Sequence, residues 1–189
     1  SSDDIKNMVS LMNHANLCAL DYPKISANLG FTPCYGGSCA ALNESNMTQK
    51  IGGVEILAKP RGKPYDDIWS EINQSYCTAA SDMLVYSFCS NPHCPDADEN
   101  NINSRVPVPG VTDVMQMNTD CDDMKFDSFK SNHSKMGVCY NTDVVVVGGN
   151  NHSVRTQGPR GGLFVIIENK NLADSMRCLL KTNSDTING

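Results

Sequence analysis

Apolar side chains recur at helical spacing along the first twenty-two residues of the chain. They follow the i, i+3, i+4, i+7 pattern of an amphipathic helix, at Ile5, Met8, Val9 and Met12. Acidic residues open this segment, where the helix dipole favours negative charge. Tyr22 precedes Pro23, and the residue before a proline avoids helical geometry. The pattern therefore predicts a long N-terminal helix over residues 1–22.

The next segments predict a loop and then a pair of strands. Residues 23–51 are punctuated by Pro33, Gly36 and Gly37, which is typical of a loop. Two short apolar stretches, GGVEILAKP (52–60) and DDIWSEI (66–72), predict a strand pair within residues 52–76. From Ser75 the side chains are small and their pattern favours a helix, which places Cys77 in the first turn of a short helix. The stretch MLVYSFC (83–89) either continues this helix or forms a third strand.

Two nearly continuous β-branched runs, DVVVV (143–147) and GGLFVIIE (161–168), predict the central strands of a sheet. The alternating stretch VTDVMQM (111–117) predicts another strand, and GGNNHSVRTQGPR (148–160) a long flexible connection. NLADSMRCLLK (171–181) has helical spacing. This order predicts one α+β domain over residues 1–189, with a long N-terminal amphipathic helix packed on a mainly antiparallel sheet.

Composition narrows the classes of partner. The chain has 189 residues, a net charge of −6 and only 15 Lys and Arg, which form no basic stripe. This argues against binding of nucleic acid or of an anionic membrane. No apolar run of eighteen residues occurs, so no membrane span is predicted. The chain begins without Met, and we expect it to be a processed or trimmed soluble part of a longer protein.

The nine cysteines favour disulfides over a structural metal, because the paired CxxC or CxxH ligands of zinc sites are missing. Disulfides imply an oxidising compartment, such as the cell surface or the extracellular space. Two close pairs, Cys34–Cys39 and Cys89–Cys94, are each separated by a four-residue gap and predict local rings. The odd count leaves one free thiol or an intermolecular bond.

For the remaining cysteines we hypothesise that Cys77 pairs with Cys178. That bond would close a loop of about one hundred residues and stabilise the fold by about 4–5 kcal/mol in the chain-entropy model. Residues 77–178 would then be a disulfide-bounded region that contains most of the loops. Cys121 would pair with Cys139 inside it, and Cys18 would be the free thiol candidate.

The motifs that could carry chemistry are incomplete. Asp96, Asp98 and Asn100 alternate as calcium ligands do, but the Gly and Glu that complete such a loop are absent, so a solvated acidic turn is the preferred interpretation over a weak cation site. His93 stands beside Cys94, which already has a predicted disulfide partner. No nucleophile elbow occurs, and the Gly-Gly after VVVV lacks the rest of a phosphate loop. We predict no enzymatic activity, no cofactor and no metal.

The layout resembles that of the type IVb pilins of Gram-negative bacteria, of which the toxin-coregulated pilin is a member. The resemblance lies in four features: the opening helix SSDDIKNMVSLMNHA, a Gly-containing loop before the first strand IGGVEILAKP, the stretch DDIWSEINQSYCTAASDML, and a cysteine close to the C terminus. It implies a pilus subunit that self-assembles, with its helix in the filament core and its disulfide-bounded region outward for surface attachment or aggregation. A membrane would be contacted only through an N-terminal segment outside this chain.

The resemblance covers most of the chain in outline, but its local motif is about twenty residues long. The apolar helix half that such subunits use for assembly is absent, and nine cysteines exceed their single characteristic bridge. The C-terminal LADSMRCLLK has no clear counterpart in the pattern.

The alternative is a secreted, viral or parasite surface glycoprotein that is rich in disulfides and binds a host receptor. Five Asn-x-Ser/Thr sequons favour it, at Asn43, Asn46, Asn73, Asn132 and Asn151. The alternative explains the sequons and the number of cysteines, while the pilin resemblance explains the order of helix, loop and strand.

Overall fold

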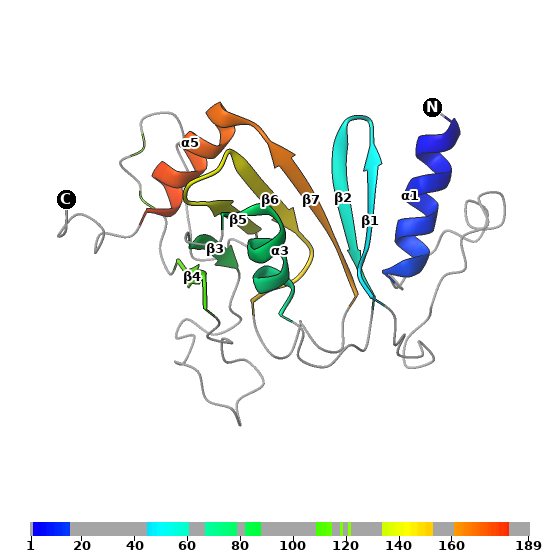
Figure 1. The fold of residues 1–189 in the computed structure, drawn as a ribbon, viewed down its shortest axis with the longest axis horizontal. Helices are drawn as coiled ribbons and strands as arrows, with labels where there is room; N and C mark the ends of the chain where they lie inside the picture. The colour runs from blue at the N-terminus through cyan, green and yellow to red at the C-terminus, as the bar shows by residue number, and fades with distance from the viewer. Residues whose placement is uncertain are drawn as a thin grey trace, which may run out of the picture.

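The computed structural model describes the parts of the chain that form one sheet and the helices against it (Figure 1). The described residues are 2–15, 45–60, 67–78, 82–87, 109–114, 118, 121, 134–152 and 161–181. Their strands form a seven-stranded sheet in the order β1-β2-β7-β6-β5-β3-β4. The strands are β1 (Met47–Ile51), β2 (Val54–Lys59), β3 (Met83–Ser87), β4 (Val111–Asp113), β5 (Lys135–Cys139), β6 (Val144–Gly148) and β7 (Gly162–Glu168).

Pairing in the sheet is mixed. The neighbours β1-β2, β2-β7, β7-β6, β6-β5 and β5-β3 are antiparallel, whereas β3 and β4 are parallel. β6 and β7 lie in the middle of the order, which confirms the central position predicted from their β-branched runs. The stretch MLVYSFC, undecided from the sequence, contains the strand β3.

The first hairpin is shorter and earlier than predicted. β1 lies inside residues 23–51, which were predicted as a loop, and pairs with β2 from Met47↔Ala58 to Ile51↔Val54. The turn between them is Gly52-Gly53, with φ of +58° and +84°. Two positive φ values in a two-residue turn match the twist of antiparallel strands and favour glycine. Gly52 and Gly53 therefore form the turn of the hairpin and do not begin a strand as predicted.

The stretch DDIWSEI is not a strand, so the predicted strand pair is wrong. It begins the helix α3 (Ile68–Tyr76), which Asp67 caps by accepting hydrogen bonds from the backbone N–H groups of Trp69 (2.9 Å) and Ser70 (3.3 Å). An aspartate at this position satisfies donors that the helix leaves free. Cys77 is the C-cap of α3 and does not begin a helix.

The two faces of the sheet carry separate apolar cores. On one face α3 packs on Leu57, Val146 and Phe164, and Trp69 meets Phe164 edge to face with ring centroids 5.4 Å apart. The strand residues that alternate with Leu57, Val146 and Phe164 face the opposite side of the sheet. There α5 (Lys170–Leu180) covers the end formed by β3, β5 and β6, and α1 (Ser2–His14) covers the end formed by β1 and β2.

The prediction of a long N-terminal helix on the sheet is wrong. α1 has 13 residues and packs mainly on the β1–β2 hairpin at one end of the sheet, where Leu11 and Ala15 contact Ile56 and Ala58 (Figure 1). Ile5, assigned to the buried stripe from the sequence, is 53% exposed. The architecture is therefore a mixed seven-stranded sheet with three short helices among the described residues, and not a long helix laid along a sheet.

α5 forms where the sequence predicts a helix. Asn169 caps it by accepting a hydrogen bond from the backbone N–H of Leu172 at 3.0 Å. Its buried face is made of Ala173, Met176, Leu179 and Leu180. Within the described ranges, no helix combines the length and the apolar character needed to cross a bilayer.

Candidate functional site

The polar cluster with the most distinctive chemistry is built around His152. This residue is 1% exposed and lies at the end of the described part of the β6–β7 connection. Its Nε2 lies 2.7 Å from Asp67 Oδ2, and its Nδ1 lies 3.0 Å from both carboxylate oxygens of Asp113. The backbone N–H of His152 donates to the hydroxyl of Ser87 at 3.0 Å.

Each partner in this cluster is fixed by its own element. Asp67 uses Oδ1 to cap α3 and Oδ2 to bind the imidazole of His152. Asp113 is the last residue of β4, and Ser87 is the last residue of β3. His152 therefore joins the β6–β7 connection to the start of α3 and the end of β4 through its side chain, and to the end of β3 through its backbone N–H. His152 lies within the connection predicted over residues 148–160, of which residues 153–160 lie outside the described residues.

The imidazole of His152 is charged. Both ring nitrogens face carboxylates, which accept hydrogen bonds and do not donate them when ionised. Burial by itself lowers the pKa of His152, but the hydrogen bonds and negative charges of Asp113 and Asp67 outweigh burial and raise it to about 9. The cluster is thus a buried cation between two anions at neutral pH.

This geometry suits a structural link and not a catalytic base. A histidine that activates a nucleophile needs one ring nitrogen directed at a hydroxyl or thiol. In His152 both nitrogens are bound to aspartates, and its side chain is sealed from solvent. The described residues also hold no group of three or more His, Cys, Asp or Glu side chains placed to bind a metal ion.

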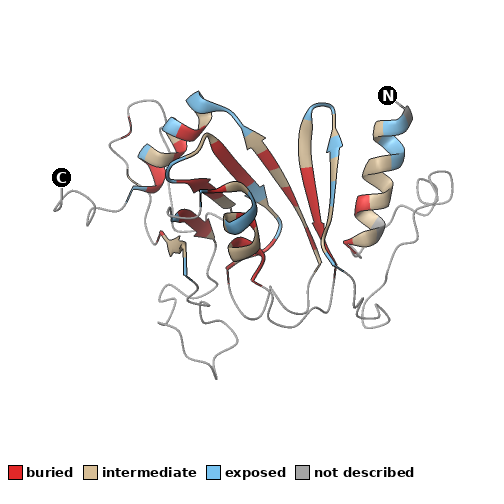
Figure 2. Cartoon of the chain, in the orientation of Figure 1, coloured by how far each residue is buried: buried red, intermediate tan, exposed pale blue. Residues whose placement is uncertain are grey.

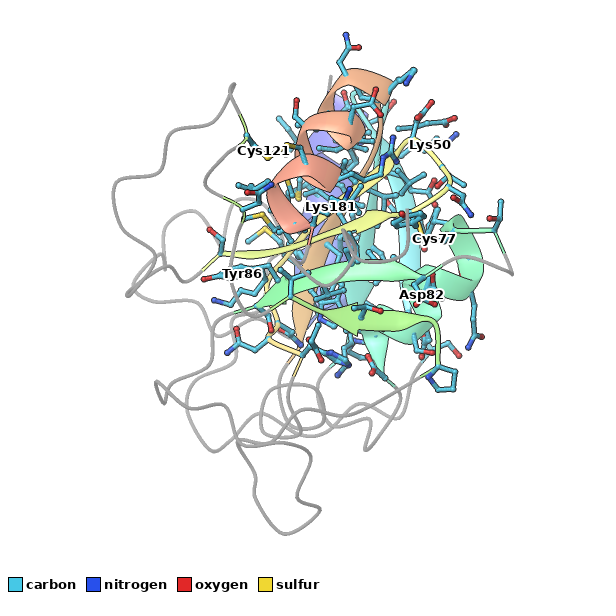
Figure 3. The ribbon with its side chains drawn as sticks, turned by 90° about the vertical axis from the view of Figure 1, so that its left-hand side faces the viewer. Lys50, Cys77, Asp82, Tyr86, Cys121 and Lys181 are labelled. Atoms are coloured by element: carbon cyan, nitrogen blue, oxygen red, sulfur yellow. A yellow bond between two sulfur atoms is a disulfide. The ribbon has the colours of Figure 1, made fainter. Side chains whose placement is uncertain are left out.

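Two disulfides also join elements that are distant in the sequence, and they differ from the hypothesised pairs. Cys77 is bonded to Cys139 and Cys121 to Cys178, so the pairs Cys77–Cys178 and Cys121–Cys139 are wrong. The two bridges interleave along the chain, with sequence separations of 62 and 57 residues. Figure 3 places Cys77 beside α3 and Cys121 beside α5. The region 77–178 is consequently closed by two crossing bonds and not by one outer bracket.

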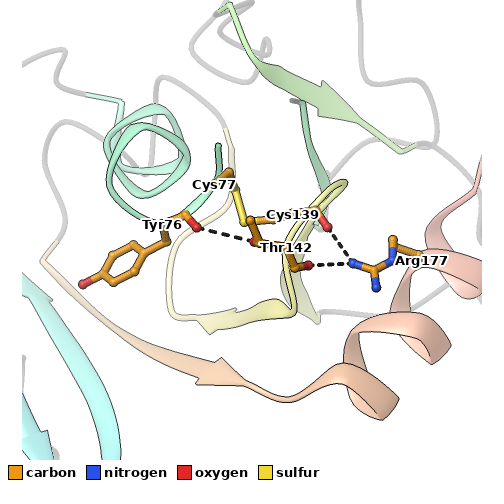
Figure 4. Close-up of a disulfide and its surroundings, with 5 residues drawn as sticks. All are labelled: Tyr76, Cys77, Cys139, Thr142 and Arg177. Atoms are coloured by element: carbon orange, nitrogen blue, oxygen red, sulfur yellow. Dashed lines mark hydrogen bonds between the residues drawn. A yellow bond between two sulfur atoms is a disulfide. The ribbon is translucent and has the colours of Figure 1, made fainter. Parts of the chain in front are cut away.

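Arg177 of α5 adds polar contacts beside the Cys77–Cys139 disulfide (Figure 4). Its Nη1 donates to the carbonyl oxygens of Cys139 (3.0 Å) and Thr142 (2.7 Å), and its Nη2 lies 2.6 Å from Asp174 Oδ1. The Thr142 hydroxyl donates to the carbonyl oxygen of Tyr76 at 3.4 Å. The end of α3, the β5–β6 turn and α5 are therefore joined by covalent and polar contacts together.

Tyr76 extends the same contacts to the hairpin. Its hydroxyl donates to Glu55 Oε1 at 2.5 Å. Burial, followed by the hydrogen bond and charge of Glu55, raises the pKa of Tyr76 to about 12. α3 is thus bound to β2 as well as to β5.

The other predicted site residues lie outside the described residues. These are the local pairs Cys34–Cys39 and Cys89–Cys94, the free thiol candidate Cys18, and the weak cation candidate of Asp96, Asp98 and Asn100. Sequence reasoning missed His152, because its partners lie 85 and 39 residues away. The one local signal was Asp67 directly before an apolar helical pattern, which indicates an N-cap.

Comparisons with protein-family models, with curated proteins and with solved structures found no match.

Proposed function

We propose that this chain is the globular domain of a bacterial filament subunit of the type IVb pilin kind, with a structural role and no catalytic one. The observation that carries the proposal is the way α1 is attached. Near its C-terminal end Leu11 and Ala15 are buried on the hairpin and the residues around them are half-buried, while Asp3, Ile5 and Lys6 near its N-terminal end are exposed (Figure 2).

The attachment of α1 is strongest at its end. Leu11 and Ala15 are fully buried, and His14 Nε2 lies 2.7 Å from the carbonyl oxygen of Ser45. Towards the N terminus Asp3, Ile5 and Lys6 are exposed. A helix that is anchored at one end and free at the other can pack against neighbouring subunits, which is what assembly through a helix requires.

The rest of the domain, which is cross-linked by disulfides and polar contacts, suits the outer part of a filament. Interleaved disulfides, the Arg177 contacts and the buried His152 cluster all join elements that are distant in sequence. Such links resist local unfolding. A subunit that is exposed on a cell surface needs this resistance. The disulfides also require an oxidising compartment, which supports a location outside the cytoplasm.

Asn46, Asn73 and Asn151 are the sequon asparagines that the structure describes, and their surroundings give little support to the glycoprotein alternative. The side-chain oxygens of Asn46, Asn73 and Asn151 are buried, and the Asn46 amide donates to Glu71. The Asn73 amide nitrogen packs against Gly110, 2.3 Å from where a Cβ would lie. A glycan is attached at the amide nitrogen, so Asn46 and Asn73 are poorly placed for one. Asn43 and Asn132 lie outside the described residues.

The test is the intact mass and N-terminal sequence of the protein isolated from its natural source. The proposal expects an additional apolar segment of about 25 residues, long enough to span a bilayer, before Ser1 and a methylated first residue. A mature chain that carries glycans on Asn43 or Asn132 and lacks such a segment would refute it and would favour the receptor-binding glycoprotein.

A further inference from the structure

The two disulfides of the described structure differ in what surrounds their sulfur atoms. Cys77 and Cys139 are buried in the apolar core against which α3 packs. Cys121 is also buried, but its partner Cys178 is exposed near the end of α5. A thiolate must reach a sulfur atom to cleave a disulfide, and exposed disulfides are the ones that exchange reversibly. The Cys121–Cys178 bond is therefore open to attack from solvent at Cys178.

This bond fixes the chain after β4 to the end of α5. Val114, directly after β4, is 1% exposed and packs in the core under α5. Further along, the backbone N–H of Asn118 donates to the carbonyl oxygen of Leu179 at 2.8 Å. Cys121 then bonds to Cys178, and Figure 3 places Cys121 beside α5.

The hydrogen bond from Asn118 satisfies a group that the helix itself leaves unpaired. The last four carbonyl groups of an α-helix have no partner within the helix. Leu179 carries one of these four in α5, and Asn118 supplies its donor. The side chains of Leu179 and Leu180 are buried. The last turn of α5 therefore depends on the stretch of chain that the disulfide holds against it.

The rest of α5 is attached independently of this bond. At the start of the helix, the backbone N–H of Asn169 donates to the carbonyl oxygen of Asp143 at 2.8 Å. Further along, Arg177 donates to the carbonyl oxygen of Thr142 at 2.7 Å. These contacts do not involve Cys121, so we expect the body of the helix to stay on the sheet when the bond is cleaved.

We propose that the Cys121–Cys178 disulfide is a reversible modification site, at which a dithiol reductant loosens the last turn of α5 while the sheet stays folded. One thiolate of the reductant attacks Cys178 Sγ and forms a mixed disulfide with it, and Cys121 leaves as a thiolate that takes up a proton. The second thiolate of the reductant then attacks the reductant's own sulfur in the mixed disulfide and releases Cys178. The protein gains two electrons and two protons as two thiols, and the reductant becomes a disulfide.

This inference goes beyond the proposed filament function and does not rest on it. The partner class is a protein or a small molecule with two neighbouring thiols. Reduction at this one bond changes the stability of one helix end, whereas the buried Cys77–Cys139 bond continues to join α3 to β5.

The experiment compares hydrogen–deuterium exchange in the wild type and in the double variant Cys121→Ser with Cys178→Ser, which isolates this bond from the other cysteines. We expect the amides of Asn118 and of the last turn of α5 to exchange about tenfold faster, equivalent to about 1.4 kcal/mol of easier local opening. The amides of α3 and β6 should exchange as before. Asn171→Ala is the matched control, since Asn171 is exposed near the other end of α5, and it should leave the exchange of Asn118 unchanged.

A second sample keeps the test independent of how the double variant folds. Brief treatment of the folded wild type with dithiothreitol, followed by alkylation, gives the same cleaved bond in a protein that has already folded. It should show the same faster exchange at Asn118. Reoxidation of a reduced sample that was not alkylated should restore the slow exchange.

Glutathione tests which sulfur is attacked, because a monothiol forms the mixed disulfide but has no second thiol to resolve it. After limited treatment and quenching with iodoacetamide, peptide mass analysis should find glutathione on Cys178 and the alkyl group on Cys121. Glutathione on Cys121 would overturn attack at Cys178.

Exchange at Asn118 that is as slow in the reduced wild type as in the oxidised protein would overturn the proposal. Equal acceleration in α3, β6 and α5 would do so as well, because the bond would then support the whole fold and not one helix end. These outcomes are separate from the proposed function, because a methylated apolar N-terminal segment on the natural protein would still establish a filament subunit.

Discussion

His152 is the residue on which distant parts of the chain depend most directly. Its charge is buried and lies between Asp67 and Asp113, so removal of the imidazole leaves two carboxylates facing each other with no cation between them. Breaking a buried ion pair by removing one partner typically costs about 3–5 kcal/mol.

We therefore expect His152→Gln to lower the free energy of unfolding by about 3 kcal/mol or more. Urea denaturation monitored by tryptophan fluorescence measures this, since Trp69 is buried in the core next to Asp67. Lys6→Gln is the control, because it removes only the exposed Asp3–Lys6 pair and should change stability by less than about 1 kcal/mol. Equal effects of the two substitutions would show that the His152 cluster is not a stabilising link.

The same cluster predicts how stability depends on pH. The pKa of His152 is about 9 in the folded protein against 6.5 for an unperturbed histidine. Because the folded pKa is raised, the stabilisation is fully present below pH 6.5 and is lost as pH rises through 9. The loss is on the order of 3 kcal/mol over that range.

Urea midpoints of the wild type and of His152→Gln between pH 6 and pH 10 test this dependence. The difference in free energy of unfolding should shrink from pH 6.5 upward and level off above pH 9. A difference that is constant across this range would mean that the imidazole does not change its protonation there.

At the scale of elements, the seating of α1 depends on a close approach to the start of β7. A Cβ at Gly161 would lie 1.6 Å from the carbonyl oxygen of Ala15, at the C-terminal end of α1. No flexible side chain is involved, so the backbone of one element must move to accommodate the methyl group.

Gly161→Ala should therefore loosen α1 while the rest of the sheet stays folded. Hydrogen–deuterium exchange would show faster exchange of the α1 amides, including that of Ala15, which bonds to Leu11 at 2.8 Å. Gly149→Ala is the matched control, since its nearest neighbours would be at ordinary contact distances of 3.5 Å or more. Unchanged exchange of α1 in Gly161→Ala would contradict the seating described.

The two disulfides differ in accessibility and should differ in reactivity. Cys77 and Cys139 are both buried, whereas Cys178 is exposed on α5 and only its partner Cys121 is buried. A reductant must reach a sulfur atom to attack it. The Cys121–Cys178 bond should be reduced first in the native protein.

Brief reduction under native conditions, followed by alkylation and peptide mass analysis, measures the order. Labels should appear on Cys121 and Cys178 well before they appear on Cys77 and Cys139. The reverse order, or simultaneous labelling, would show that the core around Cys77 opens as readily as the surface of α5.

At the scale of the whole molecule, the sequence predicts the parts with strong local signals. β6, β7 and α5 are long regular patterns, and each lies where its pattern indicates. The seven-residue stretch DDIWSEI (66–72) predicts a strand because its few apolar residues fit the period of a strand as well as that of a helix. Asp67, which caps α3, is the signal in it that favours a helix. The exposure of Ile5 depends on where α1 ends and on which element it packs. The periodic pattern of apolar residues does not show either.

The long-range contacts could not be predicted in the same way. Four cysteines allow three pairings, and sequence separation alone does not choose among them. The interleaved pattern follows from the sheet order, which places β7 between β2 and β6 and brings α5 across β5 and β3. The Asp67–His152–Asp113 cluster likewise exists only once α3, β4 and the β6–β7 connection have come together.

We propose that this domain is part of a filament. Immunogold electron microscopy of the source cells, with an antibody raised against the isolated domain, tests it most directly. We expect gold particles at regular intervals along surface filaments, and their loss when the gene is deleted. Gold confined to the cell envelope or found only in soluble material, with no labelled filament, would contradict it.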